Sequence, residues 1–131
     1  MEETNVPDVI YHRGASGYAP ENTLAAFRKA AGMGARWVEF DVMLTRDNTP
    51  ILIHDEKLER TTSGKGRVAE TDWIDLRKMD AGGWFGPEFA GEPVPTLSQA
   101  LALLGELGLG ANVEIKPSRG YEEETAHIAA A

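Results

Sequence analysis

The sequence predicts an α/β protein that forms the opening part of a (β/α)8 barrel, also called a TIM barrel. Apolar, strand-like segments alternate with segments whose apolar residues recur at helical spacing. This order implies parallel strands joined by right-handed crossovers. A complete barrel needs about 250 residues, whereas this chain has 131. We therefore expect about the first three strand–helix units, together with one small insertion.

The first unit is a strand over about residues 8–11 followed by a helix over about 23–33. A turn with Pro20 connects them, and Asn22 is a candidate helix cap because its side chain can accept a hydrogen bond from an early backbone N–H. The sequence Gly-Met-Gly at 32–34 predicts the end of this helix.

The second strand covers residues 36–44, which are rich in aromatic and branched side chains. Because side chains alternate along a strand, Glu39 and Asp41 share one face, and Val38 and Phe40 share the other. Two carboxylates opposite an apolar stripe have two explanations, a solvated surface and a functional site, and for such a pair alone the solvated surface has at least equal weight.

A turn over residues 45–49 precedes a short strand over 50–55, which contains His54 near its end. The next stretch, 56–95, is much longer than the connections usual in compact domains, so we expect an insertion. It contains a short helix near 72–79. Its aromatic residues fit local packing better than a substrate groove, because aromatic side chains dominate core burial.

The second long helix begins at Thr96, which forms a capping box with Gln99. Its apolar face consists of Leu97, Ala100, Leu101, Leu104 and Leu107. A strand over 111–116 follows and stops at a proline. The pattern over 121–131 predicts the start of another helix.

Composition narrows the functional classes. The formal net charge of −8 without a basic patch argues against a nucleic-acid partner. No apolar run reaches the length of about 20 residues that a membrane span requires. The first residues lack the basic and apolar parts of a signal peptide, so we expect a cytoplasmic location. The absence of cysteine leaves oxygen and imidazole ligands for any metal, which favours magnesium, calcium or manganese.

Ionisable residues collect where the predicted strands end, the edge at which barrels of this type carry their active sites. These residues are His12, Arg13, Glu39, Asp41, His54, Glu114 and Lys116. Each alone has a simpler explanation, such as a structural hydrogen bond or an exposed ion pair. These separate explanations would all have to be true at three different strand ends. A single common site explains the same residues more simply.

These residue types suit one kind of chemistry. Three carboxylates from adjacent strands offer hard oxygen ligands to a divalent cation. An arginine and a lysine suit the oxygens of a phosphate, and two histidines can divide the roles of acid and base. Without a nucleophilic serine or cysteine, this set indicates phosphoryl transfer, in which positioning and charge stabilisation dominate.

Seven motifs, in this order, resemble the glycerophosphodiester phosphodiesterase family. They are His12-Arg13-Gly14, Pro20-Glu21-Asn22-Thr23, Glu39-Phe40-Asp41, Pro50-Ile51-Leu52-Ile53-His54-Asp55, Arg60-Thr61-Thr62, Pro95-Thr96-Leu97 and Glu114-Ile115-Lys116. The resemblance implies a TIM barrel that hydrolyses small glycerophosphodiesters, such as glycerophosphocholine, to sn-glycerol 3-phosphate and an alcohol. Residues 56–95 correspond to the small insertion of that family, and residues 1–131 to part of its domain.

The resemblance also implies roles for the residues at the strand ends. It implies a Mg²⁺ or Ca²⁺ site at Glu39, Asp41 and Glu114, an acid–base pair at His12 and His54, and phosphate contacts at Arg13 and Lys116. In the family mechanism, the glycerol 2-hydroxyl of the substrate attacks phosphorus, and water then opens a cyclic phosphate. The residues leave open which histidine is the acid and which oligomer forms.

Two alternatives accompany this expectation. A barrel of the same kind can act on another lipid-derived diester, because fold alone does not select the substrate. The 131-residue chain can also be an inactive fragment that at most binds a divalent cation and phosphate.

Overall fold

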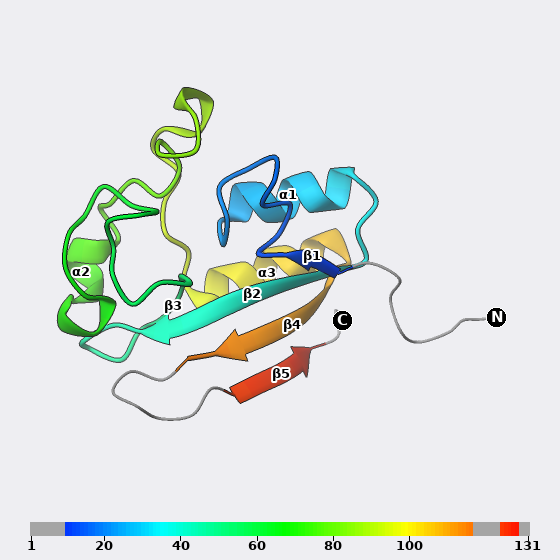
Figure 1. The fold of residues 1–131 in the computed structure, drawn as a ribbon. Coiled ribbons are helices and arrows are strands. Elements are labelled where there is room, and N and C mark those ends of the chain that lie inside the picture. The colour runs from blue at the N-terminus through cyan, green and yellow to red at the C-terminus, as the bar shows by residue number, and fades with distance from the viewer. Residues whose placement is uncertain (1–9, 117–123, 129–131) are drawn as a thin grey trace.

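The computed structural model describes residues 10–116 and 124–128, and its centre is one mixed sheet (Figure 1). The strands are β1 (Ile10–His12), β2 (Trp37–Leu44), β3 (Pro50–Leu52), β4 (Gly110–Ile115) and β5 (Glu124–Ile128). Their order in the sheet is β1-β2-β4-β5, and β3 pairs with β2. The β1–β2 and β2–β4 pairs are parallel, which confirms the predicted α/β fold as a partial barrel.

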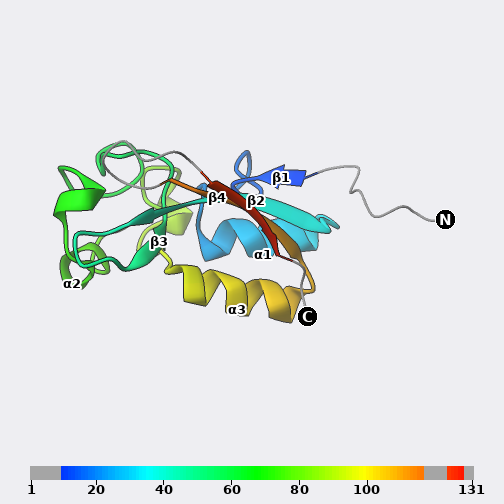
Figure 2. The same cartoon turned by 90° about the horizontal axis from the view of Figure 1, so that it is seen from below.

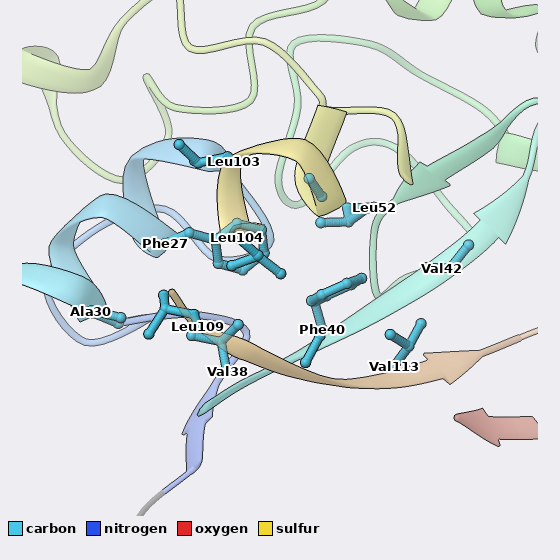
Figure 3. Packing of buried hydrophobic residues seen from close by; sticks show 13 residues of the cluster. Phe27, Ala30, Val38, Phe40, Val42, Leu52, Leu103, Leu104, Leu109 and Val113 are labelled. Carbon is cyan, nitrogen blue, oxygen red and sulfur yellow. The ribbon is translucent and has the colours of Figure 1, made fainter. Parts of the chain in front are cut away.

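Two helices, α1 (Leu24–Gly32) and α3 (Leu97–Leu107), cover the same face of this sheet (Figure 2). Phe27 of α1 packs against Phe40 of β2 with ring centroids 5.4 Å apart. Leu104 of α3 joins this core together with Val38 and Val113 (Figure 3). Within residues 10–116 and 124–128, no helix has the length and apolar character needed to cross a membrane.

The alternation of side chains along β2 and β4 separates the apolar core from a polar face. Val38, Phe40 and Val113 point to the helices, so the intervening residues point to the opposite side of the sheet. We call this opposite side the carboxylate face, defined by Glu39, Asp41 and Glu114. It contains all three acidic residues that the sequence singled out on these strands.

The helix ends differ in part from the sequence prediction. The capping box of Thr96 and Gln99 is confirmed. The cap of α1 is Thr23, whose side chain accepts a hydrogen bond from the backbone N–H of Ala26. The prediction that Asn22 caps this helix is therefore wrong, because Asn22 lies one residue too early and its amide is engaged elsewhere.

The predicted helix over 121–131 is also wrong where the structure describes it, since residues 124–128 form β5. β5 pairs antiparallel with β4. The edge of β4 offers unpaired backbone groups, and pairing them favours an extended conformation over a helix. Residues 121–123 and 129–131 of that prediction, and residues 8–9 of the first predicted strand, lie outside the described residues.

Residues 56–95 form a packed excursion around a second core. It contains two short 3-10 turns, Val68–Glu70 and Pro87–Phe89, and the helix α2 (Trp73–Leu76) within the predicted helical stretch. Its core consists of Met43, Ile51, Ile53, Leu58, Val68, Leu76, Ala81 and Val94. Three aromatic rings of the excursion contact one another edge to face, so they pack locally as the sequence indicated.

Candidate active site

The carboxylate face brings three acidic side chains together. The register of β2 and β4 pairs Asp41 with Glu114, and Glu39 lies two residues earlier on the same face. One carboxylate oxygen from each residue lies within 4.8 Å of those of the other two. This set contains only hard oxygen ligands, so it can hold a divalent cation that keeps other positions for water or substrate.

Burial and neighbouring negative charge both act on Glu39. Its side chain is 13% exposed, and burial together with the charges of Asp41 and Glu114 raises the pKa of Glu39 to about 7. A hydrogen bond from the backbone N–H of Arg13 opposes this shift only in part. A divalent cation bound between these carboxylates would favour the charged form of Glu39.

Two cations border the carboxylate face. Arg13 Nε lies 3.4 Å from Asp41 Oδ2, and it is buried without a hydrogen-bond partner. Lys116 Nζ lies 3.9 Å from Asp41 Oδ1 and 3.7 Å from Glu114 Oε2. Both side chains are largely buried, so their charges are less screened by water than surface charges are.

A tight turn after β1 delivers Arg13 to this position. Arg13 itself has a φ of 54° and Gly14 a φ of 81°. A Cβ atom on Gly14 would stand 2.7 Å from the Cβ of Ala26 in α1, so only glycine fits there. Non-glycine residues with a left-handed backbone, such as Arg13, occur more often at functional sites than elsewhere.

Asn22 is a residue of this site that the sequence analysis assigned to another role. Its Nδ2 donates to Asp41 Oδ2 at 3.1 Å, and its Oδ1 accepts from the Asp41 backbone N–H at 3.2 Å. Both residues are buried. A signal was present in the sequence, because asparagine is among the few residues that tolerate the left-handed φ of 58° found here.

The two histidines stand in different surroundings. His12 pairs with Glu39 in the β1–β2 register, and its Nε2 lies 3.5 Å from Glu39 Oε1. His54 lies after β3, which runs antiparallel to β2 and returns the chain to Asp41, where the Ile53 N–H donates to the Asp41 carbonyl. The structure thus brings His12 against the carboxylates directly.

His54 is joined to the carboxylate face through a chain of ionic side chains. Its Nδ1 lies 3.1 Å from Asp55 Oδ1. Arg60 binds Asp55 and also Glu21, and Glu21 accepts from Arg13 at 3.2 Å. Glu21, Asp55 and Arg60 lie in three of the motifs that resemble the family, but nothing in their local sequence predicted these contacts.

Comparisons with known proteins agree with this geometry. The model of the glycerophosphoryl diester phosphodiesterase family matches residues 12–131. A glycerophosphodiester phosphodiesterase from Caldanaerobacter subterraneus subsp. tengcongensis is 47% identical over 108 residues, which cover 82% of this chain and 44% of that protein.

Solved structures are similar as well. A phosphodiesterase from Oleispira antarctica, in complex with the product sn-glycerol-3-phosphate, has a TM-score of 0.86 and 47% identity over 88% of this chain and 47% of that chain. A glycerophosphodiester phosphodiesterase from Agrobacterium tumefaciens has a TM-score of 0.80 and 40% identity over 84% of this chain and 47% of that chain. The chain thus spans about half the length of the relatives it matches.

Proposed function

Because this chain belongs to the glycerophosphoryl diester phosphodiesterase family, we propose that the full-length protein hydrolyses glycerophosphodiesters to sn-glycerol 3-phosphate and an alcohol. The observation that carries this proposal is the convergence of three carboxylates with Arg13 and Lys116 on one face of the sheet. The similar Oleispira antarctica phosphodiesterase, which holds sn-glycerol-3-phosphate, supports the same product.

The domain assignment is part of this proposal. Residues 1–131 are the N-terminal part of a barrel domain, since the relatives are about twice as long as this chain. Residues 56–95 are an insertion that follows β3, the strand that pairs antiparallel with β2. A second core, which its buried side chains form together with Met43, Ile51 and Ile53, supports this assignment. The cytoplasmic location expected from the sequence belongs to the same proposal.

In the proposed site, Glu39, Asp41 and Glu114 hold a divalent cation, Mg²⁺ or Ca²⁺. The oxygen-only donor set and the raised pKa of Glu39 fit such an ion. When bound, a divalent cation neutralises charge that develops on the reacting oxygens.

Arg13 and Lys116 bind the phosphate of the substrate. Arg13 Nε and Lys116 Nζ lie 3.4 and 3.9 Å from the Asp41 carboxylate, so both place positive charge next to the proposed cation site, where it can attract a phosphate. In this low-dielectric setting, fixed cations stabilise phosphate oxygens without reorganisation of solvent. They also orient the diester, which is a large part of catalysis in phosphoryl transfer.

His12 and His54 move protons. One imidazole removes the proton of the attacking hydroxyl, and the other gives a proton to the oxygen of the leaving alcohol. No enzyme nucleophile is needed when the glycerol 2-hydroxyl of the substrate itself attacks, as the resemblance to the family implies. This arrangement restricts the substrate to diesters that carry such a neighbouring hydroxyl.

A panel of diesters tests the proposal. The purified full-length protein is incubated with glycerophosphocholine, glycerophosphoethanolamine, glycerophosphoinositol and a lysophospholipid. Release of sn-glycerol 3-phosphate from the first three is measured with a coupled dehydrogenase, and release of lysophosphatidic acid from the lysophospholipid is measured by mass spectrometry. We expect release from the water-soluble diesters, its loss with EDTA, and its recovery with Mg²⁺ or Ca²⁺. Turnover of the lysophospholipid alone would favour the alternative of another lipid-derived diester, and no turnover would refute the proposal.

A further inference from the structure

Arg60 binds two carboxylates that belong to different parts of the site. Its Nε and Nη2 donate to Asp55 at 2.7 and 2.9 Å, and its Nη1 and Nη2 donate to Glu21 at 3.1 and 2.9 Å. The planar guanidinium is thus engaged along two edges, a geometry that an ammonium group cannot reproduce.

The first of these carboxylates touches His54. Arg60 holds the pKa of Asp55 down to about 2, so this side chain is a carboxylate that only accepts hydrogen bonds. The contact of 3.1 Å with His54 Nδ1 therefore requires a hydrogen on that nitrogen. In the neutral ring, Nε2 is then left with the free lone pair.

The second carboxylate touches Arg13. Glu21 Oε2 accepts from Arg13 Nη1 at 3.2 Å as well as from Arg60 Nη2. The Glu21 side chain is 9% exposed, so its two partners stand in a fixed arrangement. Arg60 is therefore linked to Arg13 through Glu21 and to His54 through Asp55.

We propose that Arg60 is a positioning residue that fixes His54 through Asp55 and Arg13 through Glu21. His54 is thereby held as the tautomer with hydrogen on Nδ1, so that Nε2 is the atom that exchanges protons with the substrate. This inference rests on the proposed function. The contact of Arg60 with Asp55 affects proton transfer by His54, and its contact with Glu21 affects phosphate binding by Arg13.

Steady-state kinetics of the full-length protein distinguish the effect of the Asp55 contact from that of the Glu21 contact. Asp55→Asn keeps the shape of the side chain but lets an amide donate to His54 Nδ1, and we expect kcat to fall at least about 100-fold with KM nearly unchanged. Glu21→Gln is expected to raise KM with a smaller effect on kcat. Arg60→Ala affects both, by about 10-fold or more, and Arg60→Lys recovers only part of the loss.

The tautomer of His54 gives a readout that does not depend on activity. In the full-length protein labelled with ¹⁵N-histidine, the His54 resonances are assigned by their loss in His54→Gln. In the neutral ring of the wild type, we expect the ¹⁵N chemical shift of a nitrogen that carries hydrogen at Nδ1. In Asp55→Asn we expect this shift to change toward that of the tautomer with hydrogen on Nε2. If the protein hydrolyses no glycerophosphodiester, the proposed function fails, whereas this measurement still tests the positioning.

Arg46→Ala is the matched control, because Arg46 also makes a two-point contact, with Asp72, in an exposed pair outside the site. It should leave kcat, KM and the His54 shifts unchanged. Two results would overturn the inference. One is an unchanged His54 tautomer and kcat within twofold of wild type in Asp55→Asn. The other is an Arg60→Lys variant that is folded by circular dichroism and fully active.

Discussion

Asn22 and Asp41 exchange two hydrogen bonds, one between their side chains and one from the Asp41 backbone N–H to the Asn22 amide oxygen. The pair joins the loop after β1 to the middle of β2. It fixes the rotamer of a carboxylate that also faces Arg13 and Lys116. Asn22 thus supports a candidate cation ligand through Oδ2, while the second oxygen, Oδ1, faces Lys116.

This relationship predicts the behaviour of Asn22→Gly. Glycine keeps the left-handed backbone at no steric cost but removes the amide, which leaves two buried groups of Asp41 without their partner. We expect a loss of about 1–3 kcal/mol in the free energy of unfolding and weaker cation binding, measured by urea denaturation and calorimetry. Wild-type affinity for Mg²⁺ and Ca²⁺ in this variant would contradict the positioning of Asp41 by Asn22.

Substitutions at the site should separate binding from turnover. Glu39→Gln and Asp41→Asn are expected to weaken the binding of Mg²⁺ or Ca²⁺, because each removes a charged ligand. His12→Ala and His54→Ala should keep cation binding and lower kcat by about 100-fold or more, since each removes a proton-transfer group. Calorimetry and steady-state kinetics on the full-length protein measure both properties. Wild-type turnover in all four of these variants would contradict the assignment of the site.

The raised pKa of Glu39 predicts a pH-dependent affinity for the cation. Below about pH 7 a proton occupies the carboxyl group and competes with the cation, so affinity should rise about tenfold between about pH 6 and pH 8 and then level off. Calorimetric titrations with Mg²⁺ at several pH values measure this slope. Glu39→Gln should bind more weakly with a much smaller slope, and an equal slope in both proteins would contradict the assignment.

Several elements could be predicted from local sequence because their causes are local. The capping box at Thr96 and the alternation of Glu39 and Asp41 with Val38 and Phe40 depend on residues close together in the chain. The convergence of carboxylates followed from one topological rule, that parallel strands end at a common edge.

The elements that the sequence did not predict depend on partners far along the chain. Asn22 and Thr23 are adjacent residues that both favour caps, and only the position of Asp41 decides which one caps α1. The strand β5 depends on the free edge of β4 rather than on the helical pattern of its own residues. The ionic contacts of Arg60 likewise span up to 39 positions, which no local motif encodes.

The 131-residue chain by itself is predicted to be inactive. The His12 side chain is 62% exposed on the described part of the chain, although the neighbouring Glu39 is only 13% exposed, and catalysis is sensitive to misplacement of about 1 Å. Assays of this chain beside the full-length protein, both with added Mg²⁺ or Ca²⁺, check the expectation. Release of glycerol 3-phosphate from glycerophosphocholine by the short chain would refute it.

The bond that is broken tests the central claim most directly. ³¹P NMR of glycerophosphocholine incubated with the full-length protein and a divalent cation distinguishes two cleavages of the diester. We predict that the substrate resonance is replaced by that of sn-glycerol 3-phosphate, and that His54→Ala abolishes this change. Appearance of phosphocholine, or a substrate resonance that persists with the wild-type protein, would contradict the proposed function.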